Sequence, residues 1–176
     1  MKWIMIDVEA DGPCPGLYSM IELGAVYIEC DVTTYKTFYG SLRPITNVWH
    51  GQALESIGRT RSEIMEFNDP KNTMELFYNW VHSIREEDPR IGFISDNNGF
   101  DWQFVNYYLW KYVGRNPFGH SSTNLNSLCK GFLNKPKRNI GRLRKTKHDH
   151  NPVNDCIGNV EALFKLIDRG LDWPLS

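Results

Sequence analysis

The chain has 176 residues, of which 41% are hydrophobic and 23% are charged, and its formal net charge at pH 7 is −1. These values exclude a disordered or fibrous chain and are typical of a globular protein, with a length that fits one domain over residues 1–176. A net charge near zero is an average over the whole surface, so it argues neither for nor against a nucleic-acid partner.

The cysteines lack the CxxC spacing of a structural zinc site, and we interpret them as free thiols of a reducing compartment: Cys14, Cys30, Cys129 and Cys156. The amino-terminal segment becomes acidic too soon for a secretory signal, and no segment approaches the roughly 18 apolar residues of a membrane span. The sequence therefore predicts a cytoplasmic protein that does not enter a membrane.

Three strands are predicted in the first quarter of the chain, at residues 2–8, 20–30 and 34–43. Each segment is rich in β-branched and aromatic residues and is bounded by turn-forming residues. The connections between them are short, which predicts an antiparallel meander. A polar loop is expected at residues 46–59.

A helix is predicted after this loop. Asp69 and Pro70 supply an N-cap and a first-turn proline. Apolar residues then recur at three- and four-residue steps, at Met74, Phe77, Val81 and Ile84. The short apolar run at residues 90–95 follows a proline and predicts a buried strand.

The second half of the chain predicts two further helices. One covers residues 100–114, and another begins at Asn151 and Pro152. Between them, residues 123–133 are ambiguous and residues 135–150 form a polar, basic loop. Three strands followed by alternating helices and strands predict a mixed sheet covered by helices.

The first strand ends in two carboxylates with one residue between them, Asp7 and Glu9. Successive side chains of a strand point to opposite faces, so these two share one face. Two adjacent acids repel each other unless a cation or a proton neutralises them, and Mg²⁺ or Mn²⁺ suits carboxylate oxygens. A solvated strand end is the alternative, and the pair alone does not decide between the two.

Three more residues stand at predicted helix starts. Asp101 lies just inside the second helix, where the helix dipole tolerates an anion. His150 directly precedes the third helix, and Asp155 lies in its first turns. Each residue alone would be an unremarkable residue of a helix start.

The motifs DVE, GFDWQF and HNPVND together resemble those of the DEDDh family of 3′–5′ exonucleases, which has DxE, an FDxxF-like helix start and HxAxxD. The order of the motifs is the same, and the resemblance runs from about residue 3 to residue 168. Within the family, the chain looks most similar to the phage exodeoxyribonuclease A group and to small exoribonucleases.

The resemblance implies an α/β, ribonuclease H-like fold, in which a five-stranded mixed sheet with an antiparallel first part is flanked by helices. It makes Asp7, Glu9, Asp101 and Asp155 the metal ligands and His150 the general base. The implied cofactors are two divalent ions, Mg²⁺ or Mn²⁺, which activate water and stabilise the leaving 3′ oxygen. The implied products are nucleoside 5′-monophosphates released from the 3′ end.

Some positions depart from the family pattern. Pro152 replaces the usual small residue of HxAxxD and should preserve the helix start. Ala10 follows DVE where a threonine is more usual, so no side-chain hydroxyl is expected at the terminal nucleotide there. Two neighbouring candidates, Asp96 and His148, are set aside because they do not fit the motif spacing.

The basic loop at residues 135–147 has seven Lys or Arg residues and no acidic residue, and it leads to His150. A solvated loop is the ordinary interpretation of such a charge run. Beside a phosphodiester site, it would instead bind the nucleic-acid backbone. The candidates for phosphate contacts are Lys137, Arg142, Arg144 and Lys147.

Aromatic side chains near the motifs offer base stacking. Trp102 follows Asp101, and Tyr18 lies in the loop after DVE, so both are candidates for contact with a base, with core packing as the alternative. Tyr107, Tyr108 and Trp110 are expected to pack within the fold.

The expected function is therefore metal-dependent 3′–5′ exonuclease activity on single-stranded DNA or short RNA, with a homodimer suggested by analogy to related small exonucleases. Two alternatives stay open: a ribonuclease H-like endonuclease, and a catalytically silent nucleic-acid-binding module. The His150 to Asp155 spacing favours the exonuclease. A cluster of four mutually repelling carboxylates argues against a silent module.

Overall fold

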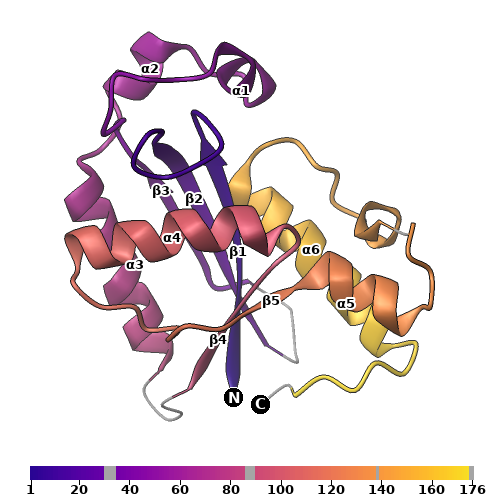
Figure 1. The fold of residues 1–176 in the computed structure, drawn as a ribbon. Helices are drawn as coiled ribbons and strands as arrows, with labels where there is room; N and C mark the ends of the chain where they lie inside the picture. Colours follow the sequence, from indigo (N-terminus) through magenta and orange to yellow (C-terminus); the bar gives the residue numbers. More distant parts are fainter. Residues whose placement is uncertain (30–34, 86–89, 138, 175–176) are drawn as a thin grey trace.

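A computed structural model describes residues 1–29, 35–85, 90–137 and 139–174. A five-stranded sheet in the order β3-β2-β1-β4-β5 forms its centre, and helices cover both faces (Figure 1). The fold class expected from the motifs, a mixed five-stranded sheet flanked by helices, is confirmed.

The first three strands are antiparallel. β1 (Lys2–Ala10) pairs with β2 (Met20–Ile28), which in turn pairs with β3 (Thr37–Ser41). The predicted strand at residues 20–30 ends earlier, and Cys30 and Thr34 lie outside the described residues.

The other two strands are parallel to β1. β4 (Ile91–Ser95) lies beside β1, and β5 (Ser122–Asn124) lies beside β4. Residues 123–133, ambiguous in sequence, contain the end of β5 and α5 (Leu125–Phe132).

Two hydrophobic clusters fix the layers, because alternate side chains of β1 point into different ones. Ile4, Ile6 and Val8 pack with α3 (Pro70–Ile84) and α4 (Asn98–Tyr112). Met5, on the other face, packs with residues of α5 and α6 (Pro152–Ile167). The predicted N-caps are present: the Asp69 side chain caps α3 and the Asn151 side chain caps α6.

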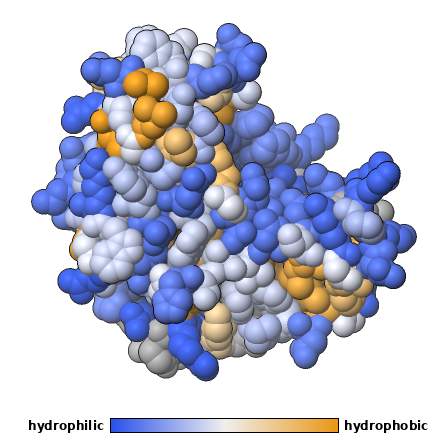
Figure 2. Space-filling model, in the orientation of Figure 1, coloured by the Kyte–Doolittle hydropathy of each residue, from blue (hydrophilic) through white to orange (hydrophobic). Residues whose placement is uncertain are grey.

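A small lobe stands above the carboxyl end of β1 and contains α1 (Gly51–Ser56) and α2 (Arg61–Met65) (Figure 1). The prediction of a polar loop at residues 46–59 is wrong, because α1 lies within it. Leu54 of α1 and Ile64 of α2 are buried against Ile21 of β2. In Figure 2, hydrophobic side chains gather on this lobe and over α5, on a face that is mostly hydrophilic.

The basic segment is also partly ordered. It contains a 3-10 helix, η1 (Ile140–Leu143), whose Ile140 and Leu143 are buried in the α5–α6 cluster. Cys14 and Cys156 are free thiols, Cys129 is buried, and Cys30 is outside the described residues. Among the described helices, none has the length and apolar character needed to cross a bilayer.

Candidate active site

Three carboxylates meet where β1 ends. One ligand oxygen from each of Asp7, Glu9 and Asp155 lies within 4.8 Å of the others. Asp155 reaches this point because the start of α6 lies directly on β2. A Cβ atom on Gly24 would stand 2.3 Å from the carbonyl carbon of Pro152, so only glycine allows this approach.

Asp101 approaches the same place from the first turn of α4. Its Oδ1 accepts a hydrogen bond of 3.1 Å from the backbone N–H of Val8, between the two acids of β1. The side chain is only 3% exposed. The structure therefore brings together the four acids that the motifs predicted, from β1, α4 and α6.

Burial and mutual repulsion disfavour the ionised form of these acids and raise the pKa of Asp7, Glu9 and Asp101. Burial, followed by repulsion from Asp155, Glu22 and Asp101, raises the pKa of Glu9 to about 8. Burial and repulsion from Asp96 raise the pKa of Asp101 to about 8, although the Val8 N–H opposes the shift. The pKa of Asp7 is also raised, chiefly by burial and then by Asp101. Bound cations would remove this penalty.

The unused oxygens fit a metal centre. Oδ2 of Asp101 and Oδ2 of Asp155 are buried, and neither has a hydrogen-bond partner among the described residues. Buried carboxylate oxygens in that condition cost free energy unless a cation or proton satisfies them. An all-oxygen donor set is the kind that Mg²⁺ and Mn²⁺ prefer.

His150 stands at the edge of this cluster. Its Nδ1 is 3.4 Å from Glu9 Oε1, and its side chain is 38% exposed. Its backbone is left-handed, with φ of 58°, an uncommon conformation for a residue other than glycine. This turn immediately precedes the N-cap Asn151, so the histidine projects before α6 begins.

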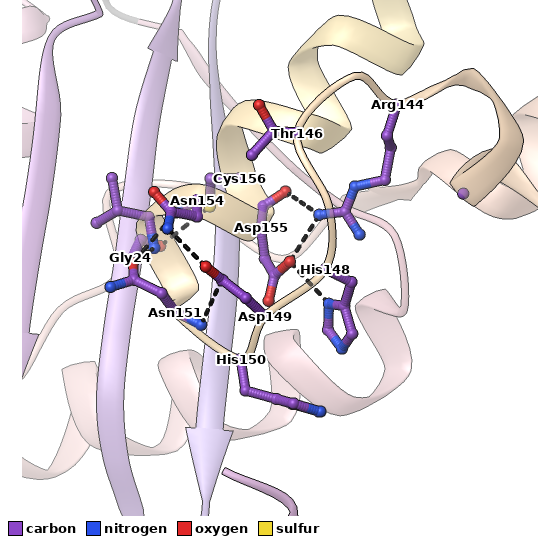
Figure 3. A network of polar contacts seen from close by, with 12 residues as sticks. Gly24, Arg144, Thr146, His148, Asp149, His150, Asn151, Asn154, Asp155 and Cys156 are labelled. Atoms are coloured by element: carbon purple, nitrogen blue, oxygen red, sulfur yellow. Dashed lines mark hydrogen bonds and ion pairs between the residues drawn. The ribbon is translucent and has the colours of Figure 1, made fainter. Parts of the chain in front are cut away.

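His148, set aside on motif spacing, also lies in the site. Its Nδ1 is 2.7 Å from Asp155 Oδ1. The rings of His148 and His150 meet edge to face with centroids 4.3 Å apart. In Figure 3, His148 points toward Asp155, whereas His150 points away from it.

Arg144 has a different place from the other predicted phosphate contacts. Its Nη2 donates to the backbone carbonyl of Asp155 at 2.6 Å and to Oδ1 of the same residue at 2.8 Å (Figure 3). The side chain is 8% exposed, so the expected loop-surface cation is instead a buried ion-pair partner of a predicted metal ligand. No sequence pattern around Arg144 predicted its contact with Asp155.

Glu161 on α6 binds the backbone of the segment that contains Arg144. Its Oε2 accepts from the N–H groups of Lys145 and Thr146 at 2.7 and 2.8 Å, and its Oε1 accepts from the Thr146 hydroxyl at 3.0 Å. Burial opposes ionisation, but these hydrogen bonds outweigh it and lower the pKa of Glu161. The segment that leads to both histidines is thus fastened to α6.

The other predicted phosphate contacts lie on the surface of the basic loop. Lys137, Arg142 and Lys147 are exposed. Lys137 lines a shallow surface pocket formed by residues 134–137 and not the carboxylate cluster.

A pocket of about 340 Å³ opens beside the carboxylates. It is lined by Ala10, Gly12, Pro13, His50, Ala53 and Phe100. Ala10 directly follows Glu9, and Phe100 directly precedes Asp101, so the pocket adjoins two of the predicted ligands. The α1 side of its wall, at His50 and Ala53, could not be found from sequence because α1 itself was read as loop.

The aromatic candidates occupy different positions. Tyr18 is half-buried, and its ring lies on Gly12, where a Cβ atom would be 2.1 Å away. Trp102 packs edge to face on Phe93 in the core. Tyr108 is fully buried as expected, whereas the packing expected for Trp110 is wrong, because Trp110 is 58% exposed.

Glu22 is a further acid that sequence reasoning missed. It is the cross-strand partner of Glu9 on β2 and is 1% exposed. Its Oε1 accepts from the Tyr39 hydroxyl and from Arg59, each at 2.7 Å. Only the strand register reveals that it lies next to the site.

Known proteins share this chain's sequence and fold. No protein-family model matches the chain. The 3′–5′ DNA exonuclease Cap18 of Escherichia coli is 33% identical over 175 residues, which cover 95% of this chain and 91% of that protein.

Solved structures share the fold at lower identity. The nuclease domain of 3′hExo, a DEDDh family member bound to rAMP, has a TM-score of 0.76 and 13% identity, over 99% of this chain and 96% of that one. E. coli exonuclease I in complex with a dA16 oligonucleotide has a TM-score of 0.70 and 16% identity, over 96% of this chain and 41% of that one. The sequence match to Cap18 extends over nearly all of both proteins, and the chain therefore belongs to the DEDDh family of 3′–5′ exonucleases.

Proposed function

We propose that this 3′–5′ exonuclease shortens single-stranded DNA with two divalent ions, Mg²⁺ or Mn²⁺, and releases nucleoside 5′-monophosphates. The observation that carries the proposal is the meeting of Asp7, Glu9 and Asp155 within 4.8 Å, beside the unpartnered Oδ2 of Asp101. The choice of DNA is supported by the relative Cap18, a 3′–5′ DNA exonuclease.

Asp7, Glu9, Asp101 and Asp155 hold the ions in this proposal. The ions supply positive charge to the scissile phosphodiester and help to activate the attacking water. The carboxylates are positioned by a central strand and two helix starts, so their geometry is set before substrate binds.

His150 is the general base. It lies at the rim of the cluster, near Glu9, with enough exposure to contact a water molecule. An imidazole can accept a proton from water and release it again at neutral pH, which suits a general base. The Nδ1 atom of the adjacent His148 lies 2.7 Å from Asp155, whereas that of His150 lies 3.4 Å from Glu9, so His150 has the looser contact with a carboxylate.

The pocket beside Ala10 and Phe100 holds the terminal nucleoside. Its wall is mostly apolar, which suits a base or sugar face, and it adjoins Glu9 and Asp101. Tyr18 supports Gly12 in its wall. A stacking role for Trp102 stays a prediction, since its ring packs on Phe93.

The exposed cations Lys137, Arg142 and Lys147 bind backbone phosphates of the substrate upstream of its end. They lie on the loop that leads to the histidines, so a strand bound in the site would pass them. Arg144 is excluded from this group by its contact with Asp155. A single exonuclease domain over residues 1–176, a homodimer and a cytoplasmic location all stay predictions.

A direct test uses purified protein and an Asp7→Ala variant with DNA and RNA oligonucleotides labelled at the 5′ end, in Mg²⁺, Mn²⁺ or EDTA. A ladder that shortens from the 3′ end of DNA, and that is lost in EDTA and in the variant, is expected. Chromatography of the released mononucleotides against nucleoside 5′- and 3′-monophosphate standards identifies 5′-monophosphate release. Faster loss of RNA than of DNA would contradict the DNA proposal, and cleavage that survives in EDTA would contradict the metal.

A further inference from the structure

The lobe beside the active site carries an exposed tryptophan on a fixed support. Trp49 is 48% exposed, and the guanidinium of Arg61 lies 4.8 Å from the centre of its ring. One side of the indole is therefore covered by a cation, while about half of the residue faces solvent. Such an arrangement is a cation–π pair with a free aromatic surface.

The support is rigid because buried contacts hold Arg61. Its Nη1 donates to Oδ2 of Asp11 at 2.9 Å, and its Nη2 donates to the carbonyl of Thr46 at 2.7 Å. Asp11 is fully buried, and its Oδ1 also accepts from the N–H of Ser19 at 2.6 Å. The positive charge of Arg61 is thus paired with the buried Asp11 carboxylate, and these contacts fix the guanidinium beside the Trp49 ring.

Trp49 is also tied to the active site through the backbone. The N–H of the next residue, His50, donates to the carbonyl of Asp11 at 2.7 Å. Asp11 is two residues after Glu9, and His50 lines the pocket beside Ala10. The exposed indole therefore neighbours a pocket residue and is linked through the His50–Asp11 hydrogen bond to the strand end that bears Glu9.

Two other apolar side chains extend this surface. Leu17 and Val48 are 53% and 44% exposed. The hydroxyl of Thr46 donates to the carbonyl of Leu17 at 2.9 Å and contacts that of Val48 at 3.2 Å, which brings the two segments together. Figure 2 shows hydrophobic side chains on this lobe of an otherwise mostly hydrophilic face. Single exposed apolar residues are common on soluble proteins, but contiguous apolar patches are typical of binding surfaces.

We propose that Trp49, supported by Arg61 and flanked by Leu17 and Val48, is a stacking platform for a base upstream of the terminal nucleotide. This rests on the proposed function of the carboxylate site. The occupant is a nucleobase because the surface continues from the pocket at the site, and because an aromatic face accepts any base without sequence preference. The platform selects substrates that have unpaired bases near the 3′ end.

The test compares Trp49→Ala and Trp49→Phe with the wild-type enzyme. Trp110→Ala on α4 is the matched control, because it removes another exposed tryptophan. Two substrates separate chemistry from upstream binding: a single-stranded DNA oligonucleotide, and the p-nitrophenyl ester of thymidine 5′-monophosphate, which has no upstream base. Thermal unfolding of each variant shows whether the lobe stays folded.

We expect Trp49→Ala to raise KM for the oligonucleotide by about 5- to 150-fold, the equivalent of one stacked base, with kcat nearly unchanged. The p-nitrophenyl ester should be hydrolysed at the wild-type rate. Trp49→Phe should recover most of the loss, and Trp110→Ala should behave as wild type. Oligonucleotides with a single abasic site should lose the penalty when the missing base is the one that stacks on Trp49.

Unchanged KM in Trp49→Ala would overturn the platform, as would an equal loss in Trp110→Ala or a penalty that persists at every abasic position. A penalty that disappears only when the terminal base is missing would also overturn it. Wild-type protein that degrades neither substrate would count against the proposed function instead, so the two failures can be told apart.

Discussion

The buried guanidinium of Arg144 donates two hydrogen bonds to Asp155, one to its backbone carbonyl and one to its side-chain carboxylate. Asp155 is 1% exposed and Arg144 is 8% exposed, so the pair is shielded from water. The predicted metal ligand on α6 is therefore held by the segment that carries both histidines.

The first prediction concerns this pair. Arg144→Met keeps much of the aliphatic volume but removes Nη2, which donates both hydrogen bonds, and so leaves the buried Asp155 carboxylate without the guanidinium. We expect the metal-free variant to lose about 3 to 5 kcal/mol of unfolding free energy. Urea denaturation in EDTA measures it.

The control for that change is Arg144→Met combined with Asp155→Asn. It removes the buried charge as well, so it should be more stable than Arg144→Met alone. A loss below about 1 kcal/mol in the single variant, which is the range of exposed ion pairs, would contradict the buried role.

The second prediction concerns Gly158 of α6, which lies under Arg144. A Cβ atom there would stand 2.3 Å from Nε of Arg144 and 2.9 Å from the carbonyl oxygen of Thr146. Alanine would improve helix propensity by about 1 kcal/mol, yet it must push this segment off α6. We expect Gly158→Ala to lower both the melting temperature and kcat.

Gly131 of α5 provides the matched control, because in the described part of the chain no atom outside its neighbours and its own helix backbone lies within 4 Å of its Cβ position. Gly131→Ala should leave activity unchanged and should not lower the melting temperature. If Gly158→Ala raises the melting temperature as much as Gly131→Ala does, the packing of Arg144 over α6 does not contribute to stability.

The third prediction concerns pH. Glu9 and Asp101 have pKa values raised to about 8, chiefly by burial. Between about pH 5 and 8, the folded metal-free protein retains protons that the unfolded chain has released, so unfolding free energy falls as pH rises. We expect the melting temperature in EDTA to decrease by several degrees across this range.

Millimolar Mg²⁺ should reverse the loss at pH 8, because the ions bind only the folded, ionised site. Glu9→Gln removes one of the acids with a raised pKa and should therefore make the pH dependence less steep. A melting temperature in EDTA that rises from pH 5 to 8 would show that the acids are already ionised in the folded protein.

The fourth prediction separates the two histidines. His150→Ala should lower kcat by about 10²- to 10⁴-fold, as expected for loss of a general base. His148→Ala removes a contact to Asp155 and should cause a smaller loss. Steady-state kinetics on the p-nitrophenyl ester and calorimetry of Mn²⁺ binding measure the two effects.

The affinity for Mn²⁺ should be retained in His150→Ala, because the imidazole of His150 is not one of the proposed metal ligands. Loss of Mn²⁺ binding in this variant would contradict the role of His150 as general base. A larger kcat loss in His148→Ala than in His150→Ala would assign the general base to His148.

Local sequence signals predicted the elements that position the acids. The Asp69–Pro70 and Asn151–Pro152 pairs and the apolar periodicity located α3 and α6, because caps and amphipathic faces are encoded nearby in the chain. The alternation at Asp7, Val8 and Glu9 predicted that the acids share a face, and Val8 lies in the core as that requires.

Contacts made by distant segments could not be predicted in this way. α1 and α2 are too short to be stable alone, and they depend on burial of Leu54 and Ile64 against Ile21. Arg144 was predicted to contact phosphate like the other cations of the basic loop, because only the fold places it over Gly158. Glu22 needed the β1–β2 register before it could be set beside Glu9.

The hydrogen bond from Val8 N–H to Asp101 has an evolutionary consequence. The ladder between β1 and β4 extends only to Met5, so beyond it the Asp101 carboxylate takes the place of a missing strand partner. Asp101 thus has a role in the fold in addition to its proposed role as a metal ligand. Among the contacts described, Glu9 and His150 accept no such hydrogen bond from the backbone. A descendant of this chain that lost nuclease activity should therefore lose Glu9 and His150 first and retain an aspartate or asparagine at position 101.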